Sequence, residues 1–238
     1  MLVKKEEDYI LACEKYYQLL AQFMVDITGT DFSIILEIGC GGGNLTGPLY
    51  DLLDSSVYIG VDLYSGVYVG SLSDMKKRKV HIMRGDVTQL GMSTESIECV
   101  FGNELLCELT REDTLSSIKE VFRVLKKGGM FVHGVLSPYP ANKAQEMVIL
   151  ADSYSEDPLY TKEWFSPPAD ELAGMFYETG FFNIGILYFT ETITFLGESA
   201  VNHVKSWHTN PEFFEKYEKD LLKYGLEYPM TQVIYGRK

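Results

Sequence analysis

Four glycines within five positions interrupt an apolar stretch of the sequence, ILEIGCGGGNLT, at residues 35–46. A single carboxylate, Glu37, lies two residues before the first of them. Glycine has no Cβ, so the chain can turn tightly there and a ligand can approach the backbone closely. The free N–H groups at the start of a following helix also favour a bound anion. The stretch therefore predicts a ligand-binding turn between a buried strand and a helix.

The spacing of these glycines distinguishes between two kinds of nucleotide site. The dinucleotide fingerprint G-x-G-x-x-G/A, started at Gly39, requires a small residue where this chain has Asn44. The pattern that fits is E-x-G-x-G-x-G, formed by Glu37, Gly39, Gly41 and Gly43. Another acid, Asp62, ends the next apolar run, where a carboxylate can accept hydrogen bonds from both hydroxyls of a ribose.

These residues need a regular scaffold, and the hydrophobic pattern supplies one. Short apolar runs predict strands, and longer runs with helical spacing predict helices. Strands that alternate with helices favour a mostly parallel sheet with helices on both faces. We expect strands at 33–38, 57–61, 80–84, 97–102, 130–135, 181–189 and 230–235, and helices at 7–24, 44–53, 111–125, 169–179 and 211–225. The glycines of Lys126-Lys127-Gly128-Gly129 are expected to cap the helix that ends at 125.

The length of 238 residues suits a single domain. Residues 1–30 are expected to form a helical cap over it. Two aromatic-rich stretches, 137–168 and 190–209, interrupt the alternation and are expected to be insertions on the substrate side. In the first stretch, the aromatic residues either pack the insertion onto the sheet or line an apolar pocket that holds a cation on aromatic faces. They are Tyr139, Tyr154, Tyr160, Trp164 and Phe165.

The net charge of −13 argues against a nucleic-acid partner, since such proteins usually present a basic face. The one dense basic run, at 75–79, is expected to be a solvated loop. Four cysteines without a C-x-x-C pair or a histidine cluster indicate neither a zinc site nor a disulfide framework, so no metal is expected. The first ten residues lack the apolar core of a signal peptide, and no run is long enough for a membrane span. We expect a cytoplasmic protein.

Taken in order, these motifs resemble those of the class I S-adenosyl-L-methionine-dependent methyltransferases. The resemblance runs from about residue 34 to residue 189. Besides the glycine motif and Asp62, it rests on three segments: Arg84-Gly85-Asp86-Val87, Leu125-Lys126-Lys127-Gly128-Gly129 and Glu178-Thr179-Gly180-Phe181. One departure lies in the fourth strand, where the family often has an acid in "fD-x-V" and this chain has Ile97-Glu98-Cys99-Val100. Glu98 is a candidate to replace that acid.

The resemblance implies a Rossmann-like seven-stranded sheet with its last strand antiparallel, and S-adenosyl-L-methionine as the cofactor, with S-adenosyl-L-homocysteine as the product. It places the methionine end and adenosine on the glycine loop, the ribose on Asp62 and the adenine amino group on Asp86. Glu37 would face the cationic end of the cofactor. The full set of expected cofactor residues is Tyr17, Glu37, Gly39, Cys40, Gly41, Asp62, Leu63, Gly85, Asp86, Val87, Asn103 and Glu104.

Methyl transfer from a sulfonium is an in-line displacement, so the enzyme chiefly aligns the reactants, and some acceptors also need a base. The candidate catalytic residues are Glu104 and His133, with Glu108 nearby. Glu104 can bind the cofactor amino group, contact the substrate or cap the following helix. His133 can also be an ordinary core histidine. Cys40 lacks a basic neighbour, so we interpret its thiol as a small filler.

We expect a small-molecule methyltransferase, as a monomer or homodimer. The turn Phe101-Gly102-Asn103-Glu104 lacks the [DN]-P-P-[YF] motif of enzymes that methylate exocyclic base nitrogens. Two alternatives stay open: an NAD(P)-dependent oxidoreductase on a related fold, and a protein that binds S-adenosyl-L-methionine without catalysis.

Overall fold

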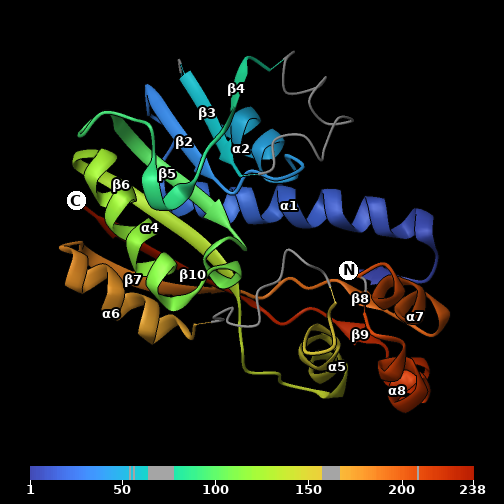
Figure 1. Cartoon of the computed structure of the whole chain (residues 1–238). Helices are drawn as coiled ribbons and strands as arrows, with labels where there is room; N and C mark the ends of the chain where they lie inside the picture. The colour runs from blue at the N-terminus through green and yellow to red at the C-terminus, as the bar shows by residue number, and fades with distance from the viewer. Residues whose placement is uncertain (54, 56, 64–77, 157–166, 208) are drawn as a thin grey trace.

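The computed structural model describes the whole chain except residues 54, 56, 64–77, 157–166 and 208. Its main feature is a seven-stranded sheet in the order β4-β3-β2-β5-β6-β10-β7 (Figure 1). The strands β4, β3, β2, β5 and β6 run parallel, and β10 is antiparallel to both β6 and β7. The bounds are β2 Ile34–Ile38, β3 Val57–Asp62, β4 Val80–Arg84, β5 Ile97–Asn103, β6 Leu125–Leu136, β7 Phe182–Phe189 and β10 Thr231–Arg237. The predicted fold class is confirmed.

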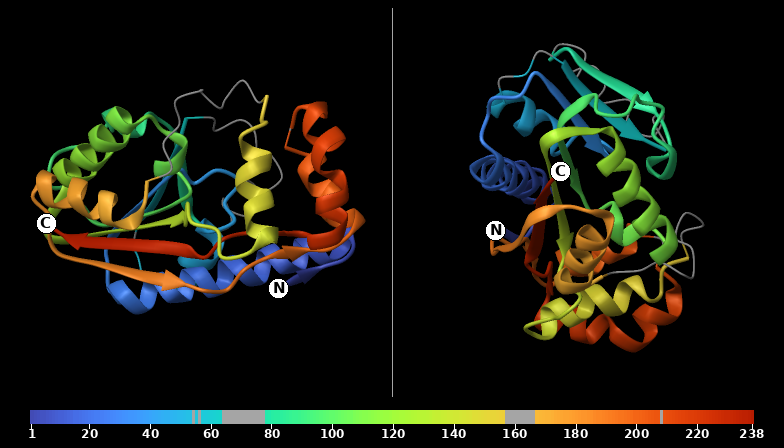
Figure 2. Two further views of the ribbon diagram at one scale, coloured as in Figure 1. Left: turned by 90° about the horizontal axis from the view of Figure 1, so that it is seen from below. Right: turned by 90° about the vertical axis from the view of Figure 1, so that its left-hand side faces the viewer.

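Helices cover both faces of this sheet (Figure 2). Alternate residues of each strand point to opposite faces, so each strand contributes to two hydrophobic clusters. Ile35 of β2 packs in a cluster with residues of α1 (Glu6–Thr28) and α2 (Thr46–Leu52). Its neighbour Leu36 packs in the other cluster, with residues of α4 (Arg111–Val124) and α6 (Ala169–Thr179). The central strands are therefore buried on both sides, which explains their continuous apolar runs.

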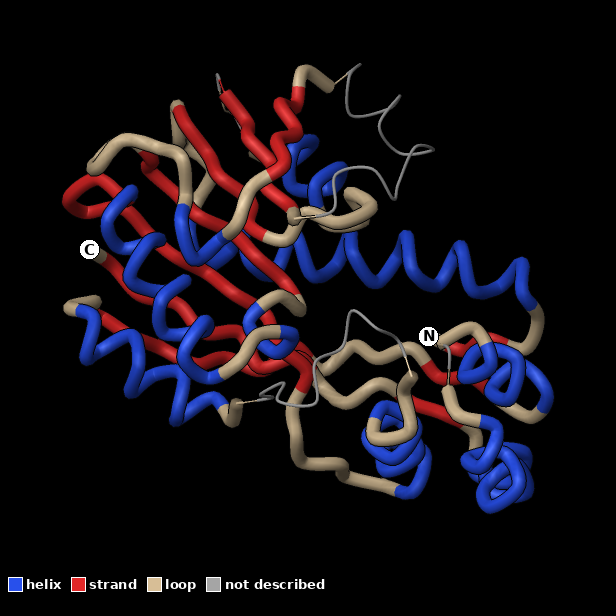
Figure 3. Tube along the Cα trace, viewed as in Figure 1, coloured by secondary structure: helices blue, strands red, loops and turns tan. Residues whose placement is uncertain are grey.

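A second, smaller sheet lies beyond the carboxyl ends of β5 and β6 (Figure 3). Its strands are β1 (Leu2–Val3), β8 (Thr194–Phe195) and β9 (Leu226–Glu227), in the order β1-β8-β9. Three helices pack around it: α5 (Lys143–Asp152), α7 (Glu198–Lys205) and α8 (Pro211–Tyr224). We call these six elements the small-sheet region. The sequence did not predict its sheet, because two-residue strands leave no periodic pattern.

The helix expected at 211–225 forms as α8 and packs against α5 and α7 in the small-sheet region. The helix α4 ends at Val124, and Leu125 is already extended, so the expected glycine cap is wrong. Gly128, with a φ of 81°, lies within β6, where its N–H donates to the carbonyl of Lys238.

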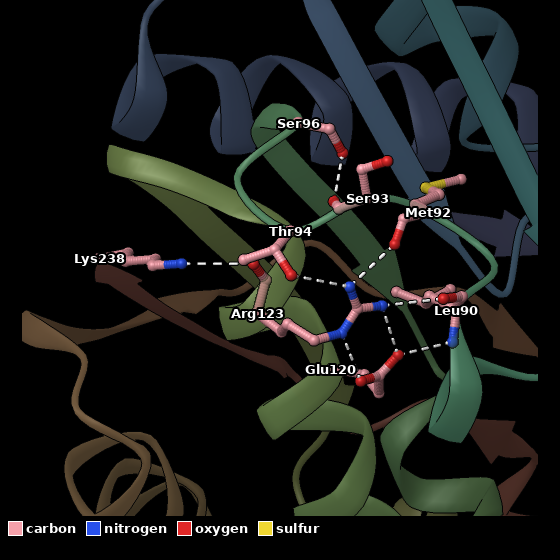
Figure 4. Close-up of polar contacts among 8 residues, drawn as sticks. All are labelled: Leu90, Met92, Ser93, Thr94, Ser96, Glu120, Arg123 and Lys238. Carbon is pink, nitrogen blue, oxygen red and sulfur yellow. Dashed lines mark hydrogen bonds and ion pairs between the residues drawn. The ribbon is translucent and has the colours of Figure 1, made fainter.

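Arg123 fastens the connection between β4 and β5 to α4 (Figure 4). Its guanidinium donates to both carboxylate oxygens of Glu120, at 2.8 and 2.9 Å, and to the carbonyls of Leu90 and Met92, at 2.9 and 2.8 Å. Glu120 Oε2 in turn accepts from the backbone N–H of Leu90 at 2.8 Å. A planar guanidinium can make all these bonds at once, so this loop is held firmly on the side of the sheet away from α1.

Among the described residues, no helix combines the length and the apolar character that a membrane span requires. The expected loop at 75–79 is described only at Arg78 and Lys79, and Arg78 pairs with Asp51 at 2.9 Å. Tyr160, Trp164 and Phe165 lie outside the described residues.

Candidate functional site

The carboxyl ends of β2, β3 and β4 bring the sequence motifs together at one edge of the large sheet. The N–H of Gly39 donates to the carbonyl of Val61 at 2.8 Å, and the N–H of Gly85 donates to the carbonyl of Asp62 at 3.0 Å. In an open parallel sheet this edge is where ligands bind. We call it the carboxyl edge.

The glycine loop between β2 and α2 has left-handed backbone at Gly39 (φ 66°), Gly41 (φ 44°) and Gly43 (φ 82°). A Cβ at Gly39 would lie 2.8 Å from Cβ of Leu105, so this glycine lets the loop pack on the turn after β5. A Cβ at Gly41 would meet no atom within 4 Å. Gly41 therefore presents bare backbone to open space, which suits the close approach of a ligand.

Asp62, beside the loop, and Cys40, within it, have different roles. Asp62 Oδ2 accepts a hydrogen bond from the N–H of Gly41 at 2.8 Å, which fixes the carboxylate beside the loop. Cys40 is buried, and a Cβ built on Gly60 of β3 would lie 3.0 Å from its sulfur. Burial also raises the pKa of the Cys40 thiol, so it is a packing residue and not a nucleophile.

Asp86 follows β4 on the same edge. Its Oδ1 accepts from the N–H and the hydroxyl of Thr88, at 2.8 and 2.7 Å, and so caps the short helix η1 (Val87–Gln89). Its Oδ2 accepts no hydrogen bond from the described residues. Val87 is buried, whereas Leu63 is 45% exposed beyond the end of β3. This arrangement leaves one exposed carboxylate oxygen and one apolar side chain available at the edge.

Glu37 is 2% exposed and lies within the sheet, on the face that α1 and α2 cover. Its Oε2 accepts from the hydroxyl of Tyr58 on β3 at 2.8 Å. Burial raises the pKa of Glu37 to about 7. The structure thus gives this carboxylate a partner inside the protein and keeps it behind the loop.

A cavity of about 800 Å³ opens between the ends of β5 and β6, the helix α1 and the small-sheet region. Aromatic side chains and three carboxylates dominate its wall: Tyr9, Tyr16, Tyr17, Trp207, Tyr228, Glu104, Glu108 and Asp152. Asn44, directly after the glycine loop, and Asn103 also line it, so the cavity begins beside the carboxyl edge. None of the lining residues that the structure describes is Lys, Arg or His.

Tyr17 reaches this cavity because its helix is fixed over the sheet. The neighbouring Tyr16 shares a buried hydrogen bond of 2.6 Å with the hydroxyl of Thr231 on β10. The two tyrosine rings meet edge to face, with their centroids 5.3 Å apart. The expected position of Tyr17 next to a ligand is compatible with this geometry.

Glu104 stands directly after β5, with a φ of 54° that is unusual for a residue with a side chain. Its N–H donates to the carbonyl of Gly134 at 2.9 Å, and its Oε2 accepts from the Cys107 thiol at 3.5 Å. Burial, with the nearby charge of Glu108, raises the pKa of Glu104 to about 8. Glu104 Oε1 and Asn103 Oδ1 are buried without a hydrogen-bond partner among the described residues. Two unpaired acceptors at the cavity wall suit a ligand that carries N–H donors.

His133 is fully buried in β6, and the cavity wall does not include it. Burial lowers its pKa to about 3, so the ring is neutral and its Nε2 accepts a weak hydrogen bond of 3.4 Å from the N–H of Leu106. This contact holds the short helix η2 (Leu106–Glu108) against the sheet. Glu98 lies near the start of β5, at the opposite edge, where it pairs with Lys126 at 2.8 Å. It does not replace the acid of the family motif at this site.

The cavity wall also includes residues that the sequence did not single out, among them Tyr9, Asp152, Trp207 and Tyr228. They come from α1, the end of α5, the segment after α7 and the segment after β9. No fixed spacing links these positions, so only the tertiary structure brings them together. The aromatic enrichment of 190–209 was the one signal available, and Trp207 of that stretch lines the cavity.

Residues 36–133 match the family model of a methyltransferase domain. This span begins in β2 and ends in β6, so it holds the glycine loop, Asp62, Asp86 and Glu104. No curated protein matches the sequence.

Solved structures share the fold over nearly the whole chain. The YcgJ protein of Bacillus subtilis has 17% identity and a TM-score of 0.67, with 92% of this chain and 97% of that one covered. A SAM-dependent methyltransferase of Archaeoglobus fulgidus has 18% identity and a TM-score of 0.57, with 97% and 99% covered. Phosphoethanolamine N-methyltransferase 2 of Haemonchus contortus has 14% identity and a TM-score of 0.61, with 92% and 52% covered. At these identities the similarity establishes the fold.

Proposed function

We propose that this chain, a class I S-adenosyl-L-methionine-dependent methyltransferase by its matched domain and its fold, transfers a methyl group to a small molecule. S-adenosyl-L-methionine is its cofactor. The observation that carries the proposal is the cavity of about 800 Å³, which begins beside the glycine loop. Its volume falls in the range typical of small-molecule sites, about 300–1,000 Å³.

The carboxyl edge fits this cofactor in several respects. Gly41 leaves open space for close approach, and Asp62 lies beside it for the ribose hydroxyls. Asp86 would take the adenine amino group through its exposed Oδ2, with Leu63, Gly85 and Val87 around the ring. Asn103, Glu104 and Tyr17 would surround the methionine end. Glu37 would act from behind the loop through its charge, since its hydrogen bond goes to Tyr58.

The sulfonium of the bound cofactor supplies an activated methyl group for in-line displacement. The chain therefore has to hold the acceptor in line with that methyl and keep water away. The enclosing residues of α1 and the small-sheet region serve both purposes. Glu104 is placed to accept a proton from the acceptor, whereas His133, buried outside the cavity, positions η2. We further infer a cytoplasmic enzyme, because the four cysteines are free thiols.

Calorimetric titration with S-adenosyl-L-methionine, S-adenosyl-L-homocysteine and NADH tests the cofactor assignment first. We expect micromolar binding of the first two and none of NADH. Labelled methyl transfer to a panel of metabolites then tests catalysis. Binding without any transfer would favour a non-catalytic binding protein, and binding of NADH alone would overturn the proposal.

Asp62→Ala tests the position of the ribose. Removing a hydrogen-bond partner should weaken S-adenosyl-L-methionine binding by about 1–3 kcal/mol, measured by the same titration. Glu178→Ala, an exposed acid on α6, is the control for loss of one charge. Equal affinities for the Asp62→Ala variant and the unmodified protein would show that the ribose lies elsewhere.

A further inference from the structure

The cavity brings three carboxyl groups together, and none of its described lining residues is a cation. Its three carboxylates come from three elements: Glu104 follows β5, Glu108 ends η2, and Asp152 ends α5. They lie close enough to influence one another, because the charge of Glu108 adds to burial in raising the pKa of both Glu104 and Asp152. Asp152 also lies at the carboxyl end of a helix, where the helix dipole disfavours an anion.

The carboxylates of Asp152 and Glu104 have unused hydrogen-bonding capacity. No described residue donates a hydrogen bond to the side chain of Asp152 or forms an ion pair with it. Glu104 Oε1 is buried and has no partner in the described part of the chain. An unpaired buried carboxylate oxygen is costly for the folded protein. Its presence at a cavity wall indicates that a ligand supplies the missing donor.

Aromatic side chains line the same cavity. The rings of Trp207 and Tyr228 stack at 10° with centroids 6.3 Å apart. The hydroxyl of Tyr228 lies 2.7 Å from Nε2 of His203, and the His203 ring lies 4.9 Å from the ring of Tyr9. His203 therefore contacts three of these rings, which we call the aromatic wall: Tyr9, Trp207 and Tyr228. Electron-rich ring faces attract cations, most strongly where water is excluded.

We propose that the methyl acceptor is an amine that is positively charged at neutral pH, bound between Asp152 and the aromatic wall, with its nitrogen directed to Glu104. This inference rests on the proposed function and names its substrate class. An anionic acceptor would meet three carboxyl groups and no cation among the described residues that line the cavity. A metal ion is a poorer occupant, since no group of three or more ligating residues suited to a metal lies among the described residues.

The reaction is consistent with these groups. The positive charge of the bound ammonium favours the ionised form of Glu104, whose own proton leaves to solvent as the ligand binds. The ammonium then gives one proton to this carboxylate, which leaves a neutral amine with a free electron pair. That pair forms the new C–N bond as the C–S bond breaks, and the electrons of the C–S bond stay on sulfur as a thioether. The nitrogen becomes an N-methylammonium, so the product keeps the positive charge. The proton on Glu104 leaves to solvent after the product departs.

The test uses three probes of similar shape: 2-phenylethylamine, neutral 2-phenylethanol and anionic 3-phenylpropionate. Each is titrated into the complex of the protein with S-adenosyl-L-homocysteine, and amines, alcohols and carboxylates are compared as acceptors of labelled methyl. We expect the amine to bind at least 10-fold more tightly than the alcohol, and we expect transfer to amines. Preference for the alcohol or the carboxylate in binding, or transfer only to acceptors other than amines, would overturn the proposal.

Asp152→Asn keeps the shape of the side chain and removes its charge. We expect it to weaken amine binding or raise the amine KM about 10-fold, with the affinity for S-adenosyl-L-methionine unchanged. Glu215→Gln, an exposed acid on α8, is the matched control. An unaltered amine affinity in Asp152→Asn would contradict the inference. Failure of the proposed function is seen separately, as absence of binding by both S-adenosyl compounds.

Discussion

The two ends of the candidate site, the carboxyl edge and the small-sheet region, are built in different ways. At the carboxyl edge, consecutive strands of one sheet end side by side, and much of the site is backbone, with glycines at 39, 41 and 43 and N–H groups beside Asp62. At the small-sheet region, segments from both ends and the middle of the chain meet, and the site consists of side chains. A site built of backbone suits one fixed ligand, such as the proposed cofactor, whereas a site built of side chains can be altered to suit one acceptor.

The free-energy cost of holding a charged carboxylate also differs between the two ends. The carboxylate of Asp62 has a backbone donor at 2.8 Å, so its charge is stabilised before any ligand binds. At the small-sheet region, Asp152 has no such donor among the described residues, and burial raises its pKa to about 7. The first end is thus preorganised, whereas the second depends on the ligand for its charge balance.

Gly41→Val should give the largest effect and should act on the carboxyl edge alone. Its side chain would extend into space that is open in the protein and that the cofactor is proposed to occupy. We expect the affinity for S-adenosyl-L-methionine to fall by roughly 100-fold or more, about 3 kcal/mol, measured by calorimetry.

Gly128→Val is the matched control, because Gly128 also has a positive φ and open space around it but lies at the other end of β6. Both variants should lose comparable thermal stability from backbone strain. If the two variants bind the cofactor equally, Gly41 does not face the ligand and the contrast between the two ends fails.

Glu104 lies between the two ends, and Glu104→Gln tests its protonation state through the pH dependence of the free energy of unfolding. Burial raises the pKa of Glu104 from 4.5 to about 8. The folded protein therefore retains this proton at a pH where the unfolded chain has lost it. The stability contributed by protonated Glu104 is fully present below about pH 4.5 and is lost as the pH rises through about 8.

Relative to Glu104→Gln, the unmodified apo protein should lose on the order of 2 kcal/mol of unfolding free energy between pH 5 and pH 8.5. Urea denaturation of both proteins across this range measures the difference. The buried histidines and Glu37 are present in both proteins, so their titration largely cancels. A constant difference across the range would show that Glu104 is ionised at neutral pH and has adequate partners.

The carboxyl edge was largely predictable from the sequence, for a physical reason. Bare backbone requires glycine at 39 and 41, and the end of a strand places Asp62 beside them. The features of this edge therefore depend on residue types that are close together in the sequence. The seven strands and the antiparallel last strand followed from the family resemblance. Local pattern misled at residues 126–129, because the two lysines and two glycines resemble a helix end while β6 begins directly after α4.

The small-sheet region could not be predicted in the same way. Its two-residue strands form because β1, β8 and β9 pair across distant parts of the chain. Asp152 ends an ordinary apolar helix, and nothing near it in the sequence marks it as part of a cavity. Likewise His133 drew attention as a titratable group in a strand, but its burial makes it a packing residue. Contacts between distant parts of the chain determine the strand pairing, the position of Asp152 and the burial of His133.

His203→Phe should give the smallest effect and should act on the small-sheet region alone. His203 stacks on Phe195 with ring centroids 3.9 Å apart, and a phenyl ring preserves this packing. What is lost is the hydrogen bond of 2.7 Å to the hydroxyl of Tyr228. We expect about 1 kcal/mol of destabilisation, or a Tm lower by about 2–4 °C, and no change in cofactor affinity.

A double-mutant cycle with Tyr228→Phe separates this hydrogen bond from general damage to packing. Each single variant removes the same bond, so the double variant should lose little more than either one. Additive losses would mean that the bond contributes nothing and that His203 acts by stacking alone. In that case the aromatic wall is held by packing with Phe195, and the orientation of Tyr228 toward an acceptor would depend on the ligand, as the charge balance of Asp152 does.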